Sequence, residues 1–267
     1  MPASDLTALR RPLEAILREA GALARETARG PFKQWTKGPD HSPVTEADIA
    51  VNDLLRERLA PLVPDAGWRS EESQDDLPDD ARTLAWIVDP IDGTRAFISG
   101  RADWTISVAL ADRGRPVLAA LYAPITKEMF LASRGGGATL NDATIKASSG
   151  GKLSGAKLAG PKRYLDRLSG LTPDTLAQPK IHSLALRIAR VAQGALDAAV
   201  ASPGSRDWDL AAADLLVHEA GGALTDFVGQ PLIYSIAHGA HGALVAAGEA
   251  RHDTLINLVR DRETEFA

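Results

Sequence analysis

The chain has 267 residues, 45% of them hydrophobic, which is enough apolar material for a sizeable core in one or two domains. Acidic and basic residues are mixed and leave a net charge of −5, so general nucleic-acid binding is not expected and any phosphate affinity must be local. The absence of cysteine excludes a disulfide framework and is compatible with a reducing cytoplasm. No signal-like segment or long apolar run is present, so we expect a cytoplasmic protein.

Hydrophobic periodicity predicts helices and strands that alternate along the chain, which favours a layered fold. In chain order we first expect a helix ending at Gly30, a hairpin or loop over 32–39, a helix after Thr45 and a strand over 84–88. Antiparallel strands over 105–111 and 117–122 and a hairpin around 135–137 should follow. The remaining expected elements are a strand over 157–159, a helix over 183–193, a strand over 196–201, a helix over 208–219, a strand over 243–247 and a terminal helix over 253–262. The Gly- and Ser-rich segment 147–155 predicts a boundary between an N-terminal α+β domain, residues 1–147, and a C-terminal α/β domain, residues 148–267.

Two acidic motifs precede the first long buried strand. Thr45 and Asp48 have the spacing of a capping box, which by itself would explain Asp48. Glu71 and Glu72 are read as an extended pair whose side chains point to opposite sides, so at most one faces a shared site. Lys37, in the preceding loop, is interpreted as solvated, with an approach to a metal or phosphate as the alternative.

The stretch from Trp86 to Thr94 is the most informative motif of the chain. An apolar strand stops at Pro90, and Asp89 and Asp92 flank this stop three residues apart. Carboxylate oxygens are the ligands that Mg²⁺ prefers. The N–H groups of Gly93 and Thr94, at a helix start, can take phosphate oxygens. A simple helix cap is the alternative explanation for Asp92.

A further acidic pair, Asp207 and Asp209, opens the apolar helix that closes at Gly221-Gly222. First-turn acids are favoured by the helix dipole, so each has a local explanation. However, four acids lie at strand ends or helix starts, where ligand sites of layered folds collect: Glu71, Asp89, Asp92 and Asp209. If these carboxylates converged, they would repel one another unless cations neutralised them. We therefore predict a two-Mg²⁺ clamp of the kind used for phosphoryl displacement.

The order of the motifs resembles the inositol monophosphatase superfamily of Mg²⁺-dependent, lithium-sensitive phosphatases. The motifs are SPVTEAD at 42–48, SEES at 70–73, WIVDPIDGT at 86–94 and WDLAAADLLVHEAGG at 208–222. The likeness runs from about Ser42 to Gly248. It implies a layered α-β-α-β-α sandwich of the inositol monophosphatase and fructose-1,6-bisphosphatase type, and a homodimer.

The resemblance also implies which residues hold the metal ions. Glu71, Asp89 and the backbone carbonyl of Ile91 would bind the first Mg²⁺. Asp89, Asp92 and Asp209 would bind the second, and a weaker third ion would lie near Glu71. Two to three Mg²⁺ ions are thus expected, and Mn²⁺ can substitute.

Catalysis by direct attack of water follows from the same resemblance. Glu71 and the first metal would hold the attacking water, and Thr94 and Asp48 would form the dyad that takes its proton. The backbone N–H groups of Gly93 and Thr94 would anchor the phosphate. No cysteine or histidine nucleophile is required.

The substrate is less clearly indicated than the reaction. Members that hydrolyse inositol monophosphate carry a glutamate seven residues before the WD aspartate, where this chain has Ser202. Arg95 after DGT and Arg187, 22 residues before Asp209, are similar to the bisphosphate nucleotidase branch. Arg187 and Arg206 are candidates to bind the second phosphate of adenosine 3′,5′-bisphosphate, with a surface ion pair as the alternative.

We therefore rank 3′(2′),5′-bisphosphate nucleotidase first, inositol-1-monophosphatase or a related sugar phosphatase second, and histidinol-phosphate phosphatase third. The expected partner is a small phosphorylated metabolite, with neither a nucleic-acid polymer nor a membrane. The six histidines lack ligand spacing, so a zinc site is not expected. The competing class is a catalytically silent homologue that binds a phosphorylated ligand, which the presence of every proposed acid disfavours.

Overall fold

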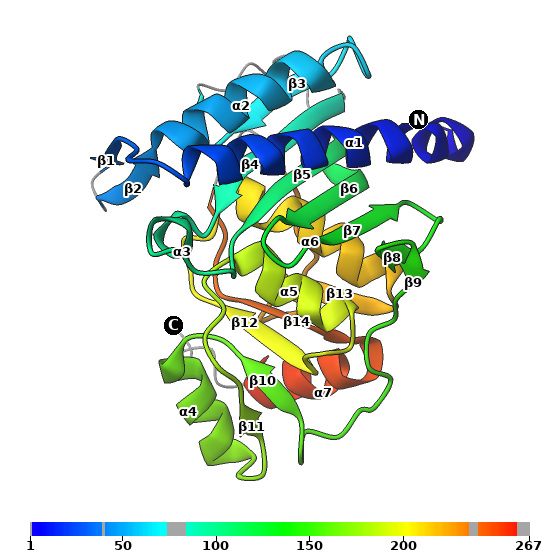
Figure 1. Ribbon diagram of the computed structural model, residues 1–267. Helices are drawn as coiled ribbons and strands as arrows, with labels where there is room; N and C mark the ends of the chain where they lie inside the picture. Colours follow the sequence, from blue (N-terminus) through cyan, green and yellow to red (C-terminus); the bar gives the residue numbers. More distant parts are fainter. Residues whose placement is uncertain (1, 39–40, 74–83, 235–239, 261–267) are drawn as a thin grey trace.

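Two β-sheets alternate with three layers of helices in the computed structural model, which describes residues 2–38, 41–73, 84–234 and 240–260 (Figure 1). One helix pair covers the outer face of the first sheet, a second lies between the sheets, and a third packs on the outer face of the second sheet. These pairs are α1 (Ala3–Thr27) and α2 (Glu46–Leu59), α5 (Leu184–Ala192) and α6 (Asp207–Glu219), and α4 (Lys162–Leu171) and α7 (Glu249–Val259). This confirms the predicted α-β-α-β-α sandwich.

The first sheet has seven strands in sequence order, with β3 parallel to β4 and every later neighbour antiparallel. Its strands are β3 (Gly67–Ser70), β4 (Leu84–Asp92), β5 (Thr105–Asp112), β6 (Arg115–Ala123), β7 (Glu128–Ser133), β8 (Ala138–Leu140) and β9 (Ala143–Thr144). A separate hairpin, β1 (Gln34–Lys37) with β2 (Ser42–Thr45), leads into α2. The short helix α3 (Thr94–Ile98) follows β4.

The second sheet has the order β11-β10-β12-β14-β13, in which the first three strands are parallel and β14 is antiparallel to both of its neighbours. Its strands are β10 (Lys157–Ala159), β11 (Leu176–Ala177), β12 (Ala198–Ala201), β13 (Gly222–Asp226) and β14 (Leu244–Gly248). The switch between the sheets falls in 145–156, around the Gly- and Ser-rich segment. The exact domain boundary at 147/148 stays a prediction.

Sequence patterns explain where the central elements begin and which way they face. Thr45 and Asp48 form the predicted capping box at the start of α2. In β4, Trp86 and Val88 pack towards α1 and α2, whereas Ile87 packs towards α5 and α6, as strand alternation requires. Helix α6 is apolar on nearly all sides, because it is enclosed by both sheets.

Most predicted elements are present, but some differ. The last helix begins at Glu249 instead of Asp253, because β14 runs directly into it at Gly248. Helix α4 and strands β2, β3, β9, β11 and β13 were not predicted, since most of them are short or weakly patterned. The hairpin expected within 32–39 is formed instead by β1 with β2, which lies beyond that range. The acidic loop over 75–80 and His238 lie outside the described residues.

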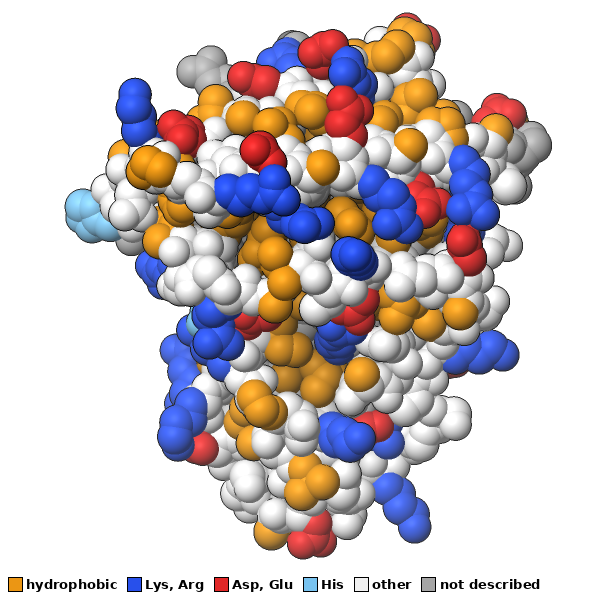
Figure 2. All heavy atoms as spheres, viewed as in Figure 1, with side chains coloured by type: hydrophobic (Ala, Val, Ile, Leu, Met, Phe, Trp, Pro, Cys, Tyr) orange, Lys and Arg blue, Asp and Glu red, His pale blue; other side chains and the backbone are white. Residues whose placement is uncertain are grey.

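Charges of both signs are interspersed on the face drawn in Figure 2, in keeping with the small net charge of −5. None of the helices within the described residues combines the length and hydrophobicity needed to cross a bilayer.

Candidate metal centre and active site

An irregularity in β4 places two carboxylates on one face of the first sheet. In a regular strand, residues three apart point to opposite faces. The pairing of β4 with β5 shifts register between Asp89 and Asp92, around Pro90, which cannot donate to the ladder. As a result, Asp89 keeps the α6-facing side of Ile87, and Asp92 joins it there.

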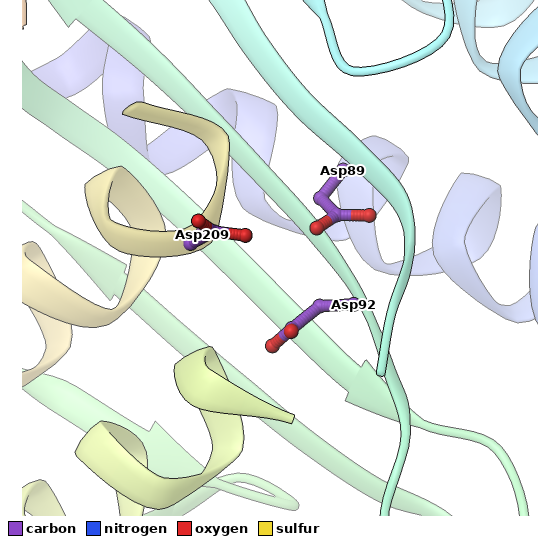
Figure 3. Close-up of side chains that lie close together, drawn as sticks. All are labelled: Asp89, Asp92 and Asp209. Carbon is purple, nitrogen blue, oxygen red and sulfur yellow. The ribbon is translucent and has the colours of Figure 1, made fainter. Parts of the chain in front are cut away.

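The start of α6 brings the third carboxylate to the same place. The backbone N–H of Arg206 donates to Asp209 Oδ2 at 2.7 Å, which fixes this side chain in a capping interaction. One carboxylate oxygen from each of Asp89, Asp92 and Asp209 lies within 4.8 Å of the other two. Figure 3 shows the three side chains pointing towards a common centre, two from β4 and one from α6.

Burial and mutual repulsion make the ionised state of this group unfavourable without a cation. Burial raises the pKa of Asp89 well above its usual range, and the charges of Glu71, Asp92 and Asp209 raise it further. Burial, followed by the charge of Asp92, raises the pKa of Asp209 to about 8. Such a concentration of carboxylates fits a site that binds a divalent cation.

Asp92 is held by the N-terminus of α5, a contact that the sequence analysis did not identify. Ser183 Oγ donates to Asp92 Oδ2 at 2.5 Å, and the N–H of Ala185 donates to the same oxygen at 2.7 Å. The N–H of Leu184 reaches Asp92 Oδ1 at 3.1 Å. These bonds lower the pKa of Asp92, although burial dominates and raises it overall. The serine before an apolar helix was the available sequence signal, as an N-cap.

Glu71 lies beside Asp89 at the end of β3, but Lys37 engages its carboxylate. Lys37 Nζ is 3.2 Å from Glu71 Oε1 and 2.5 Å from Glu72 Oε1, and it donates to the Glu71 carbonyl at 3.0 Å. The prediction of opposite-facing glutamates is wrong, because the chain turns after Ser70 instead of staying extended. The preferred interpretation of Lys37 as solvated is also wrong, since the β1–β2 hairpin carries it to the glutamates.

The predicted Thr94–Asp48 pair is present next to the carboxylate group. Thr94 Oγ1 lies 3.4 Å from Asp48 Oδ1 and 3.1 Å from the carbonyl oxygen of Ile91. The other carboxylate oxygen of Asp48 accepts the N–H and the hydroxyl of Thr45 at 2.8 and 2.6 Å. Burial is the main cause that raises the pKa of Asp48 to about 6.

Comparison with known proteins identifies the family of the chain. The family model described as the inositol monophosphatase family matches residues 5–264. The chain belongs to this family. It is 35% identical to a histidinol-phosphatase of Mycobacterium tuberculosis, over 82% of this chain and 85% of that one. It is 34% identical to an inositol-1-monophosphatase of Rhizobium meliloti, over 81% and 84% of the two chains.

A solved structure has the same overall fold. The extragenic suppressor protein suhB of Bartonella henselae superposes with a TM-score of 0.84 at 28% identity, over 96% of this chain and 99% of that one. Members of the inositol monophosphatase family are phosphatases, and this chain is accordingly an enzyme of that type. The family generally uses Mg²⁺, and the donor set here, three carboxylates with oxygens inside 4.8 Å, suits such an ion.

The residues expected to select the substrate are less tightly grouped. Arg187, on α5, is largely buried near Asp92, and its Nε has no hydrogen-bond partner among the described residues. Arg206 and Arg95 are exposed, and Ser202 is half-buried in the loop before α6. Among the predicted specificity residues, Arg187 combines a largely buried position with a charge close to Asp92, whereas the exposed Arg206 acts on Asp209 from the surface.

Proposed function

We propose that this protein is a Mg²⁺-dependent phosphomonoesterase that hydrolyses a small phosphorylated metabolite by direct attack of water. The observation that supports this most is the convergence of the Asp89, Asp92 and Asp209 carboxylates from two distant segments. These three residues would hold one ion, and Glu71, Asp89 and the carbonyl of Ile91 would hold another. Bound divalent ions would neutralise the phosphate oxygens and favour ionisation of the attacking water.

The residues around this group would supply the proton transfer. Thr94 Oγ1 lies in donor geometry 3.4 Å from Asp48 Oδ1, so the hydroxyl would pass its proton to this carboxylate while it accepts a proton from water. The water oxygen forms a bond to phosphorus, the ester P–O bond breaks, and the leaving oxygen takes up a proton from solvent. The raised pKa of Asp48, about 6, makes it a suitable proton acceptor near neutral pH.

A bisphosphate nucleotide such as adenosine 3′,5′-bisphosphate is the substrate that the position of Arg187 favours. A largely buried guanidinium with an unpaired Nε beside the site can bind a second phosphate by a charge-assisted hydrogen bond. The backbone N–H groups of Gly93 and Thr94 would anchor the reacting phosphate. Arg206 and Ser202, on the loop before α6, would contact the remainder of the ligand.

Histidinol phosphate and inositol 1-phosphate are the second candidates. The relatives at 35% and 34% identity are named histidinol-phosphatase and inositol-1-monophosphatase, and they match over four fifths of the chain. A single terminal phosphate would leave Arg187 to contact a hydroxyl or an imidazole in place of a second phosphate.

A substrate panel tests the reaction and the substrate separately. Phosphate release from adenosine 3′,5′-bisphosphate, inositol 1-phosphate, fructose 1,6-bisphosphate and histidinol phosphate is measured at equal concentration, with Mg²⁺ or with EDTA. Activity that requires Mg²⁺ supports the proposal, whereas absence of turnover on every ester would indicate a silent homologue.

Two matched variants decide the role of Arg187. Arg187→Gln is expected to raise KM for the bisphosphate by about tenfold, the effect of losing one charged hydrogen bond. Arg190→Gln, on the same helix, loses a contact to Glu128 instead and should leave KM unchanged. Equal KM values for the two variants would exclude a bisphosphate contact by Arg187.

A further inference from the structure

Two buried charged side chains, Arg69 and Asp207, and the largely buried imidazole of His241 form a group next to the carboxylates, and none of them belongs to the carboxylate group. Arg69 is 3% exposed and lies on β3, and Asp207 is fully buried at the first position of α6. Arg69 Nη1 donates to Asp207 Oδ2, and His241 Nε2 is 2.7 Å from Asp207 Oδ1. Both carboxylate oxygens of Asp207 are thus engaged from opposite sides of the sandwich.

We propose that Arg69, Asp207 and His241 act as a positioning group that sets the place of Asp209 and of the loop before α6. The inference rests on the proposed function, because it concerns the same metal site. It assigns no contact with substrate to these residues, only control over groups that make such contacts.

The connectivity supports this role on the metal side. Arg69 stands two residues before Glu71, and Asp207 stands two residues before Asp209. The Arg69–Asp207 ion pair therefore connects the end of β3, which leads to the predicted metal ligand Glu71, with the start of α6, which carries the ligand Asp209. Ser107 Oγ, on β5, also donates to the carbonyl of Trp208 at 3.2 Å, so the first turn of α6 is fixed at two points.

The connectivity supports the same role on the substrate side. The N–H of His241 donates to the carbonyl of Ser205 at 2.9 Å, and the N–H of Gly204 donates to the His241 carbonyl at 2.8 Å. Arg206 pairs with Ala240 in an isolated bridge. His241 thus holds the loop that follows Ser202 through its backbone, while its ring holds Asp207.

The energetics make a purely stabilising role a poor explanation. A buried ion pair loses hydration of both charges, so its net contribution to stability is small compared with a well-packed apolar pair. Breaking one partner, in contrast, leaves a buried charge uncompensated and would shift the elements it joins. The desolvation free energy of the buried group is offset in function if the group fixes the positions of metal ligands, as residues that contact metal ligands commonly do.

The decisive measurement is Mg²⁺ affinity of the folded protein, followed by calorimetric titration and by the Mg²⁺-induced rise in Tm. We expect Asp207→Asn to weaken Mg²⁺ binding by about 10-fold or more, the usual effect of removing a contact behind a metal ligand. His241→Ala should do the same to a smaller degree. His241→Gln, which keeps a donor towards Asp207, should restore most of the affinity.

Asp197→Asn is the matched control, because Asp197 pairs with Arg251 at 3.2 Å, partly buried and away from the site. It should lower Tm while leaving Mg²⁺ affinity unchanged. Unaltered Mg²⁺ affinity in His241→Ala, with the fold retained by circular dichroism, would overturn the inference even if Asp207→Asn failed to fold. A wild-type protein that binds no Mg²⁺ would instead refute the proposed function, and the inference with it.

Discussion

Gly93 is a position where one added methyl group should disturb both backbone and site. It separates Asp92 from Thr94 and has φ of +95°, in the left-handed region that side chains disfavour. A Cβ at this position would lie 3.2 Å from the backbone nitrogen of Ser183 and 3.3 Å from the carbonyl oxygen of Asp103. Both neighbours are backbone atoms, so they cannot move away without shifting their segments.

The size of the effect follows from a comparison with Gly100, at the other end of α3. Gly100 has φ of +65°, but a Cβ there would meet nothing within 4 Å. Gly100→Ala should therefore cost only the left-handed backbone strain, about 1–2 kcal/mol. Gly93→Ala carries similar strain and also presses on Ser183, for a total on the order of 3 kcal/mol. Because Ser183 donates to Asp92, the shift should reach the metal site as well.

Urea denaturation gives the free energy of unfolding of both variants, and a Mg²⁺ titration of phosphatase activity gives the half-saturation constant. We expect the Mg²⁺ constant to rise in Gly93→Ala and to stay unchanged in Gly100→Ala. Equal stability losses in the two variants, together with unaltered Mg²⁺ dependence, would refute the argument that this glycine is required by close approach of α5.

Three further outcomes follow from the site and the core. Asp89→Asn should lower kcat by several orders of magnitude while circular dichroism shows an intact fold, and near-normal turnover would contradict the metal assignment. Thr94→Ala should lower kcat without changing Mg²⁺ affinity by calorimetry, since the hydroxyl is placed in proton transfer; an unchanged rate would remove the dyad with Asp48. Burial raises the pKa of Asp214 to about 6 from 3.8. Because the folded state holds this proton more tightly than the unfolded chain, stability due to this group falls as pH rises from about 4 to beyond 6. Asp214→Asn, which can still accept from Tyr234, should abolish this loss, about 3 kcal/mol, in urea melts between pH 4 and 7. If the free energy of unfolding of the wild type and of Asp214→Asn changed with pH in the same way, Asp214 would not be the cause of the loss.

The sequence predicted those parts of the site that local chemistry specifies. Asp89, Asp92 and Asp209 stand at a strand end and a helix start, and such positions collect at one edge of a layered fold. The capping box of Thr45 and Asp48 was likewise visible from its spacing, and the structure confirms it. The roles assigned to these residues, and the substrate, remain predictions.

Contacts between segments far apart in the sequence could not be predicted from local sequence patterns. Ser183 looked like an ordinary N-cap, and nothing in its neighbourhood indicated that its hydroxyl also reaches Asp92, 91 residues earlier. Lys37 was misjudged because its environment depends on the pairing of β1 with β2 and on the turn after β3. Asp207 has the pattern of a first-turn acid, yet its partner Arg69 lies on β3 of the first sheet, 138 residues away.

The three clustered carboxylates come from both halves of the sandwich, β4 of the first sheet and the helix that precedes β13 of the second. A cation bound between them would cross-link the two halves of the molecule, and its binding free energy would add to the free energy of unfolding of the whole protein. The concentration of divalent ions would then also set how readily a protease cleaves the unfolded chain, independently of how fast the enzyme turns over.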